Sequence, residues 1–138
     1  MTGPMRVSSD RGDYLEIARA DRLTDDYAPA LLVRVGFRGF TAEAECSVPR
    51  EGWLGFTQDL VILETRRQGV AKVESISPGE LALVVRSLDH AGHVGVEGTV
   101  GHQSYHGKAS LTFGVLAFDQ SQLVGFVCCA RAISASLE

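Results

Sequence analysis

The chain has 138 residues, of which 45% are hydrophobic and 22% charged, as expected for a globular domain with one hydrophobic core. Its 13 basic residues are outnumbered by 17 acidic residues, which gives a formal net charge of -4, and the basic residues form no run or stripe. This distribution disfavours a nucleic-acid-binding protein, whereas a mildly acidic surface suits either solubility alone or a basic protein partner.

The sequence also bears on the cellular compartment. No apolar stretch approaches the roughly 20 residues that a membrane-spanning helix needs, and the N-terminus lacks the apolar segment of a secretory signal. The cysteines are Cys46, Cys128 and Cys129, an odd number without the spacing of a disulfide framework. We therefore expect no membrane partner and a reducing, cytoplasmic location.

In residues 1–29, the alternation of apolar and polar side chains separates one predicted strand from the segments before and after it. Residues 1–12 carry no periodic apolar pattern, so we expect a flexible N-terminal tail there and a single domain over residues 13–138. From Tyr14 to Ala18 apolar and polar residues alternate, which predicts a short strand. Residues 21–29 contain several turn-forming residues and predict a loop.

Residues 31–48 carry the clearest pattern in the chain. Apolar and polar side chains alternate over residues 31–37 and again over residues 40–48, which predicts two half-buried strands. Between them, Arg38-Gly39 has the length of a two-residue hairpin loop, while one long bulged strand is the alternative.

The apolar spacing then becomes helical, with one face formed by Trp53, Phe56, Leu60 and Leu63. Gly69 supplies a stop, so this segment predicts a helix of about five turns. An exposed anchor pair formed by Trp53 and Phe56 is the alternative, but the face that they share with the two leucines favours the core.

Strand patterns return in the second half of the chain, at residues 71–76, 80–88, 94–100 and 109–118. The short links between these segments favour antiparallel pairing, and the longest link is the polar loop of residues 101–108. Asp119 and Gln122 have the spacing of a capping box, and helical apolar spacing follows them, so we expect a closing helix.

The fold class predicted by this order is α+β: a single domain with a largely antiparallel sheet of about six or seven strands and two helices packed on one face. The core beneath the helices should contain Leu31, Val33, Val35, Phe37, Leu60, Leu63, Leu83, Val94, Val96, Leu111, Phe113 and Val127. The other sheet face should stay partly polar and carry Arg34, Glu43, Glu45, His93, Glu97, Thr99, Ser110 and Thr112.

Motifs for catalysis or cofactor binding are weak. The histidines form two local pairs, His90 with His93 and His102 with His106, without the further ligands of a zinc site. No Gly-x-Ser-x-Gly elbow occurs, and Cys128 and Cys129 lie among apolar residues as packed thiols would. The spaced glycines of residues 92–98 lack the ending of a phosphate-binding loop and indicate close packing instead. We therefore predict no catalytic residue, no metal and no cofactor.

A family resemblance rests on short motifs in a fixed order: Val35-Gly36-Phe37-Arg38-Gly39-Phe40, the segment Trp53 to Leu60, Gly92 to Gly98, Leu111-Thr112-Phe113-Gly114, and Phe118 to Leu123. Together they resemble the small bacterial WapI-type immunity proteins and their uncharacterised relatives, over about residues 13–134. The resemblance implies a cytosolic antidote that binds the toxin domain of a polymorphic toxin system, typically a nuclease, and blocks it. The partner would be a protein, and an antidote needs complementary surface rather than an active site.

Two surfaces are candidates for contact with such a partner. The first is the polar sheet face with Glu43, Glu45, His93 and Glu97, whose acidic groups would steer a basic toxin towards the inhibitor. The second is the polar loop of residues 101–108, with His102, Tyr105 and His106.

Two other functions stay open at this point. A small-ligand-binding or enzymatic domain could use His93 and Glu97 in a pocket between sheet and loop, because a novel site leaves no motif. An interaction module without a toxin is the other possibility. A basic toxin gene immediately upstream would favour immunity, and a metabolic operon would favour the ligand-binding function.

Overall fold

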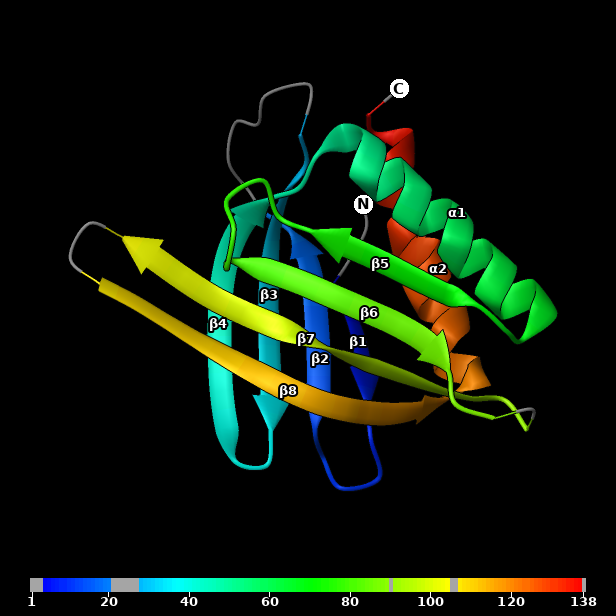
Figure 1. Cartoon of the computed structure of the whole chain (residues 1–138). Coiled ribbons are helices and arrows are strands. Elements are labelled where there is room, and N and C mark those ends of the chain that lie inside the picture. Colours follow the sequence, from blue (N-terminus) through cyan, green and yellow to red (C-terminus); the bar gives the residue numbers. More distant parts are fainter. Residues whose placement is uncertain (1–3, 21–27, 90, 105–106, 138) are drawn as a thin grey trace.

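The computed structural model describes residues 4–20, 28–89, 91–104 and 107–137, which form two antiparallel four-stranded sheets and two helices (Figure 1). Sheet 1 contains β1 (Met5–Ser8), β2 (Tyr14–Arg19), β3 (Ala30–Phe37) and β4 (Phe40–Ser47), and α1 (Arg50–Arg66) follows it. Sheet 2 contains β5 (Val70–Glu74), β6 (Leu81–Ser87), β7 (His93–Ser104) and β8 (Gly107–Asp119), and α2 (Gln120–Ala135) follows it. Each half of the chain is therefore a four-stranded meander followed by a helix.

The α+β class, the antiparallel pairing and the two helices are confirmed. The described residues contain eight strands, above the six or seven predicted, and these form two sheets instead of one. A flexible tail over residues 1–12 is wrong for Met5–Ser8, which pair with β2 as an edge strand. Met5 and Val7 are both buried on the inner side of this strand. With only two apolar positions, a strand this short leaves no detectable period, and its stability comes from its neighbours.

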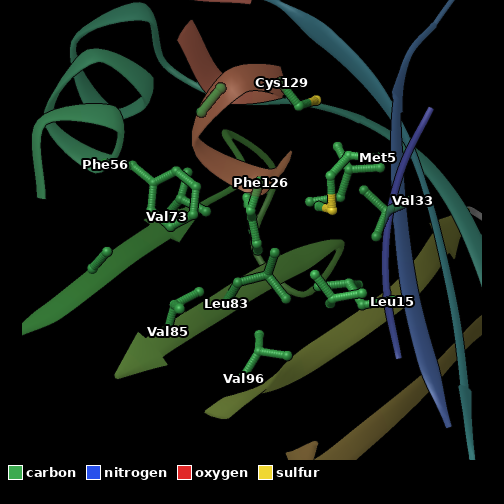
Figure 2. Close-up of a cluster of buried hydrophobic side chains, with 14 of the residues drawn as sticks. Met5, Leu15, Val33, Phe56, Val73, Leu83, Val85, Val96, Phe126 and Cys129 are labelled. Atoms are coloured by element: carbon green, nitrogen blue, oxygen red, sulfur yellow. The ribbon is translucent and has the colours of Figure 1, made fainter. Parts of the chain in front are cut away.

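The core lies between the two sheets, whose apolar faces point toward each other. β4 contacts β7 and β8 directly, while α1 packs on β5 and β6 and α2 packs on β1, β7 and β8. Figure 2 shows Leu15 and Val33 of sheet 1 opposite Val96 of sheet 2, with Phe126 of α2 reaching between the sheets. All the predicted core residues belong to this cluster, with Phe37 and Leu111 only partly buried in it.

The two-residue hairpin is confirmed at the tip of β3 and β4. Phe37 pairs with Phe40, and both loop residues adopt positive φ, 56° at Arg38 and 85° at Gly39. Two positive φ values are typical of the tight turn that matches the twist of a hairpin. The alternative of one long bulged strand is thereby excluded for residues 31–48.

Both predicted helices are present, and their ends are held by specific contacts. The buried face of α1 contains Trp53, whose indole Nε1 donates to the Ala130 carbonyl oxygen of α2 at 3.2 Å. Asp119 caps α2 by accepting from the backbone N–H of Gln122 at 3.3 Å. The Gln122 amide binds both backbone groups of Ser8, at 2.7 and 3.0 Å, so the start of α2 is tied to β1.

Phe126 tests the role of α2 as the bridge between the sheets. Its side chain is 1% exposed and its ring lies 5.9 Å from that of Phe56 on α1. We expect Phe126→Ala to lower the free energy of unfolding by about 3–5 kcal/mol, because it leaves a cavity in the shared core. Urea denaturation measures this change.

Val124→Ala is the matched control, since Val124 lies on the same helix and is 47% exposed. A change within about 0.5 kcal/mol is expected for the control. Equal losses in the two variants would contradict the packing described for α2.

Candidate functional site

The residues predicted to form one polar face are divided between the two sheets. Glu43 and Glu45 point outward from β4 in sheet 1, and His93 and Glu97 point outward from β7 in sheet 2. Because the apolar faces of the sheets meet in the core, the outer faces point away from each other. A single face with all four side chains is therefore wrong: alternation identifies the outer side of each strand but not the sheet to which the strand belongs.

The same division applies to the rest of the predicted polar face. Arg34 accompanies Glu43 on sheet 1, while Thr99, Ser110 and Thr112 belong to sheet 2. The predicted contact residues Tyr105 and His106 lie outside the described residues.

The expected loop over residues 101–108 is also corrected, because β7 continues to Ser104 and β8 begins at Gly107. His102 therefore lies on a strand, paired with Ala109. The sequence predicts a loop because this part lacks apolar alternation. Figure 1 shows the β7–β8 hairpin projecting past β4, and residues 107–110 near its tip are exposed.

The outer face of sheet 1 carries a ladder of alternating charges across its four strands. Arg6, Glu16, Arg34 and Glu43 are successive cross-strand neighbours. Their N···O distances are 3.5, 3.7 and 3.2 Å, in that order along the ladder. The two arginines and Glu43 are about half exposed, so each pair contributes about 0–1 kcal/mol. Glu43 is thus partly neutralised by Arg34.

The outer face of sheet 2 is also engaged in local pairs. The Arg86 Nε lies 3.0 Å from a carboxylate oxygen of Glu97, and the hydroxyls of Thr99 and Thr112 lie 3.0 Å apart. The spaced glycines of residues 92–98 are expected to mark close packing. A Cβ at Gly98 would collide with the Ala82 carbonyl oxygen on β6, and one at Gly95 would collide with the Val115 side chain. The close-packing prediction is confirmed for these two glycines, whereas Gly92 lies in the preceding turn with a φ of 97°.

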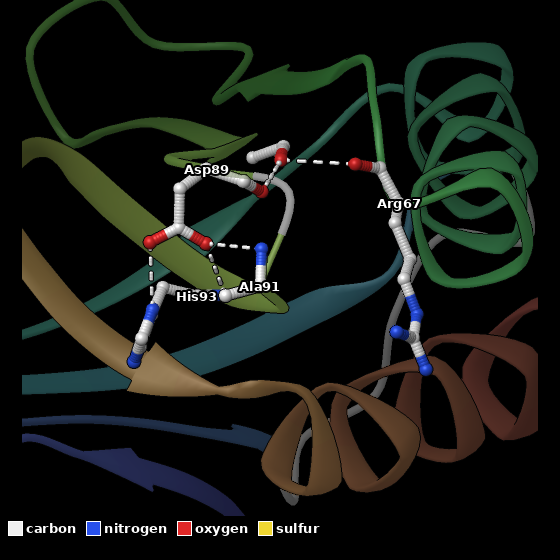
Figure 3. Close-up of polar contacts among 5 residues, drawn as sticks. Arg67, Asp89, Ala91 and His93 are labelled. Carbon is white, nitrogen blue, oxygen red and sulfur yellow. Dashed lines mark hydrogen bonds and ion pairs between the residues drawn. The ribbon is translucent and has the colours of Figure 1, made fainter.

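His93 belongs to a network that shapes the turn between β6 and β7 (Figure 3). One carboxylate oxygen of Asp89 accepts from the backbone N–H groups of Ala91 and His93, at 2.8 and 3.2 Å. The other oxygen lies 2.7 Å from Nδ1 of the His93 ring. The hydroxyl of Ser87 lies 3.0 Å from the carbonyl oxygens of both Arg67 and Asp89, which links this turn to the end of α1.

These contacts lower the pKa of Asp89 below its ordinary value of 3.8, and the hydrogen bond from the His93 side chain is the largest cause. The backbone N–H of His93 acts in the same direction. Hydrogen bonds to a carboxylate favour its charged form. The His93 ring nitrogen Nδ1 is thus occupied by Asp89, which gives this histidine a structural role in the turn.

The three cysteines differ in exposure, since Cys128 is exposed while Cys46 and Cys129 are buried. Burial raises the pKa of the Cys129 thiol, and the neighbouring Cys128 acts in the same direction. A catalytic thiol needs the opposite shift, because the thiolate is the nucleophile. Cys129 is therefore placed and tuned as a packed core residue.

A shallow groove lies where the β7–β8 hairpin projects past β4. It has a volume of about 280 Å³ and is lined by Phe40, Thr41, Ala42 and Glu43 of β4 together with Val100, Gly101, His102, Ala109, Ser110 and Leu111 of the hairpin. We call it the β4 groove. Sequence reasoning missed it, because the alternation assigns Phe40 to the apolar side of β4 without showing that the side chain is 68% exposed there.

Within the described residues, no group of three or more His, Cys, Asp or Glu side chains is arranged to hold a metal ion. None of their helices is long and apolar enough to span a membrane.

Comparisons of the chain with protein-family models, with curated proteins and with solved structures find no match. The resemblance to the WapI-type immunity proteins therefore stays a prediction.

The Asp89 network generates a pH prediction. Because folding lowers the pKa of Asp89, its carboxylate stabilises the fold above the ordinary value of 3.8, and this contribution disappears as the pH falls through the lowered value. We expect Asp89→Asn to be less stable than the wild type at about pH 6, and the difference to shrink towards about pH 3. Urea midpoints at the two pH values measure both effects.

Asp59→Asn is the control, since Asp59 is an exposed aspartate of α1. It should change the midpoint little at either pH. A pH-independent deficit of the Asp89 variant would show that the carboxylate charge is not what holds the turn.

Proposed function

We propose that this protein is an immunity protein, which binds a cognate bacterial toxin domain, typically a nuclease, and neutralises it by occlusion. The observation that carries the proposal is the ordered set of motifs over about residues 13–134 that resemble those of the WapI-type family. The partner is a protein, and the protein acts in the cytoplasm, where such a toxin would work.

The arrangement of the polar side chains supports a binding surface over a reaction centre. Among the described residues, the candidate groups are held in separate local pairs, Glu97 with Arg86, His93 with Asp89, and Glu43 with Arg34. General acid–base or nucleophilic catalysis needs such groups to converge on one point. Broad, half-exposed sheet faces are instead suited to complementary contact with another protein.

Electrostatics would act mainly on the rate of association. With a formal net charge of -4, the chain attracts a basic domain at long range, and salt screens this attraction. A few buried anchors in the interface would then determine how long the complex lasts.

Co-expression with the candidate toxin encoded beside the gene tests the function. We expect the toxin alone to stop growth, the pair to grow, and the two purified proteins to form a stable complex. Failure to bind or protect against any neighbouring toxin would contradict immunity, and a metabolic operon at the locus would favour a ligand-binding domain.

Charge reversal tests which sheet face the toxin approaches, because the structure separates the acidic candidates. We expect the double variant Glu43→Lys with Glu45→Lys on β4 to slow association about tenfold and to reduce its salt dependence. Glu97→Lys, on the outer face of sheet 2, should leave the rate nearly unchanged.

Stopped-flow association at two salt concentrations measures these effects, and a thermal melt of each variant checks the fold. Exposed charge changes usually alter stability by less than about 0.5 kcal/mol. The opposite ranking of the two variants would assign the approach to sheet 2.

A further inference from the structure

β4 is an edge strand of sheet 1. The β3–β4 hairpin determines which backbone N–H and C=O groups of β4 point away from β3, towards the open edge. In a two-residue hairpin the closing pair, here Phe37 and Phe40, exchanges backbone hydrogen bonds. Alternate residues along β4 then point their N–H and C=O groups in opposite directions. Ala42 therefore bonds to β3, whereas Thr41 and Glu43 direct their backbone groups away from it.

A contact at the far end of β4 agrees with this assignment. The carbonyl oxygen of Ser47, which is an even number of residues from Thr41 and Glu43, accepts from the backbone N–H of Ile76 at 2.8 Å, outside sheet 1. Within the described part of the chain, no backbone hydrogen bond reaches the corresponding groups of Thr41 and Glu43. An unpaired strand edge is a template for pairing with another chain.

The β4 groove lies at this open stretch, between β4 and lining residues of the β7–β8 hairpin. Figure 1 shows this hairpin projecting past β4. Leu111 of the hairpin, which is half-buried, lines the groove from that side, while its cross-strand neighbour Val100 is buried beneath the groove. Phe40 lines it from β4 with a 68% exposed ring. The groove thus joins unpaired backbone to apolar side chains, the combination that binds an added strand.

We propose that the β4 groove captures an extended segment of the partner protein, which pairs with β4 at Thr41 and Glu43. Alternate side chains of this segment are apolar and lie beneath the hairpin, and those between them are basic and lie beside Glu43 on the outer face. The partner itself comes from the proposed function, and the proposal adds how that partner is held.

The charge and the shape of the edge select this occupant. Residues directly opposite each other in an antiparallel pair share a face, so the residue opposite Glu43 lies with it on the outer side. A lysine or arginine there adds to the charge ladder, whose last members are Arg34 and Glu43. An acidic residue at the same place would face a carboxylate.

A second copy of this chain does not fit the same edge. Antiparallel pairing of two β4 strands about a twofold axis would continue the sheet and place both β7–β8 hairpins on the same side of it. Each hairpin projects past its own β4, so both hairpins would have to lie over the same two β4 strands. A single extended segment brings no second hairpin to this edge.

Synthetic peptides test the groove directly. The probe is acetyl-Val-Lys-Val-Lys-Val-amide, and the protein is the full chain labelled with ¹⁵N. We expect peptide addition to shift the amide signals of Thr41 and Glu43 and to slow their hydrogen exchange. The same peptide with a methyl group on the backbone nitrogen of each lysine should bind about tenfold more weakly. These two residues lie opposite Thr41 and Glu43, and their backbone N–H groups would donate to β4.

Protein variants separate backbone pairing from charge. Thr41→Pro removes an N–H that β3 does not use, and proline is tolerated on edge strands, so the variant should fold and bind about tenfold more weakly. Glu43→Lys should weaken the lysine peptide but not a glutamate peptide of the same pattern. Glu74→Lys, at an exposed glutamate of β5, is the matched control and should bind as the wild type does.

The outcomes distinguish this proposal from the proposed function. The proposal for the β4 groove would be wrong if peptide addition left the amide signals of Thr41 and Glu43 unchanged. It would also be wrong if the N-methylated peptide bound as tightly as the unmethylated one, and the folded Glu43→Lys variant bound the lysine peptide as tightly as the wild type. If the toxin domain bound the wild type and folded Thr41→Pro equally, the proposal for the β4 groove would also be wrong, while the immunity function would still be supported. If no neighbouring toxin binds but the peptide protects the amides of Thr41 and Glu43 from exchange, strand capture by the β4 groove is supported and the immunity function is contradicted.

Discussion

The constraint on which this structure depends is that neither four-stranded meander can cover its own apolar face. Sheet 1 and sheet 2 each present one such face, and they bury it against each other and against the helices. The helices cross over between the halves, since α1 follows sheet 1 but packs on β5, and α2 follows sheet 2 but packs on β1. The Gln122 contacts with Ser8 and the Trp53 contact with Ala130 reinforce this exchange. We therefore expect the two halves to fold as one cooperative unit.

The sequence contains the local structure but not the assignment of strands to sheets. Alternation predicts which side of β3 is buried, and the Arg38-Gly39 loop, the helical face of α1 and the Asp119 cap are all recoverable from residue type and spacing. Period alone does not reveal that the two groups of strands stack as separate sheets, so the sequence predicts His93 and Glu43 on one face. The sequence predicts β7 and β8 but gives the outer end of their hairpin as a loop over residues 101–108, because strands that project beyond the core need no apolar alternation.

Polar side chains on the sheet faces are paired locally, whereas the strand edges differ in how far their backbone groups are open to pairing. On the sheet faces, charges are paired across strands, and Asp89 with His93 organises a turn. At the edges, β1 is short and β8 contains an irregularity opposite Val96 and Gly98, features that discourage pairing with other chains. Along β4, in contrast, Thr41 and Glu43 leave an open stretch of backbone beneath a projecting hairpin. This contrast makes the β4 groove the place where a protein partner gains most from an added strand.

We propose that this protein inhibits a toxin by binding it, with the edge of β4 as the point of attachment. Hydrogen–deuterium exchange of the purified protein, alone and with the neighbouring toxin domain, tests both parts in one measurement. We expect a stable complex in which the amides of Thr41 and Glu43 become protected, while the turn that contains Asp89 and His93 exchanges as before. Protection confined to the outer face of sheet 2, or no change on adding the toxin domain, would contradict it.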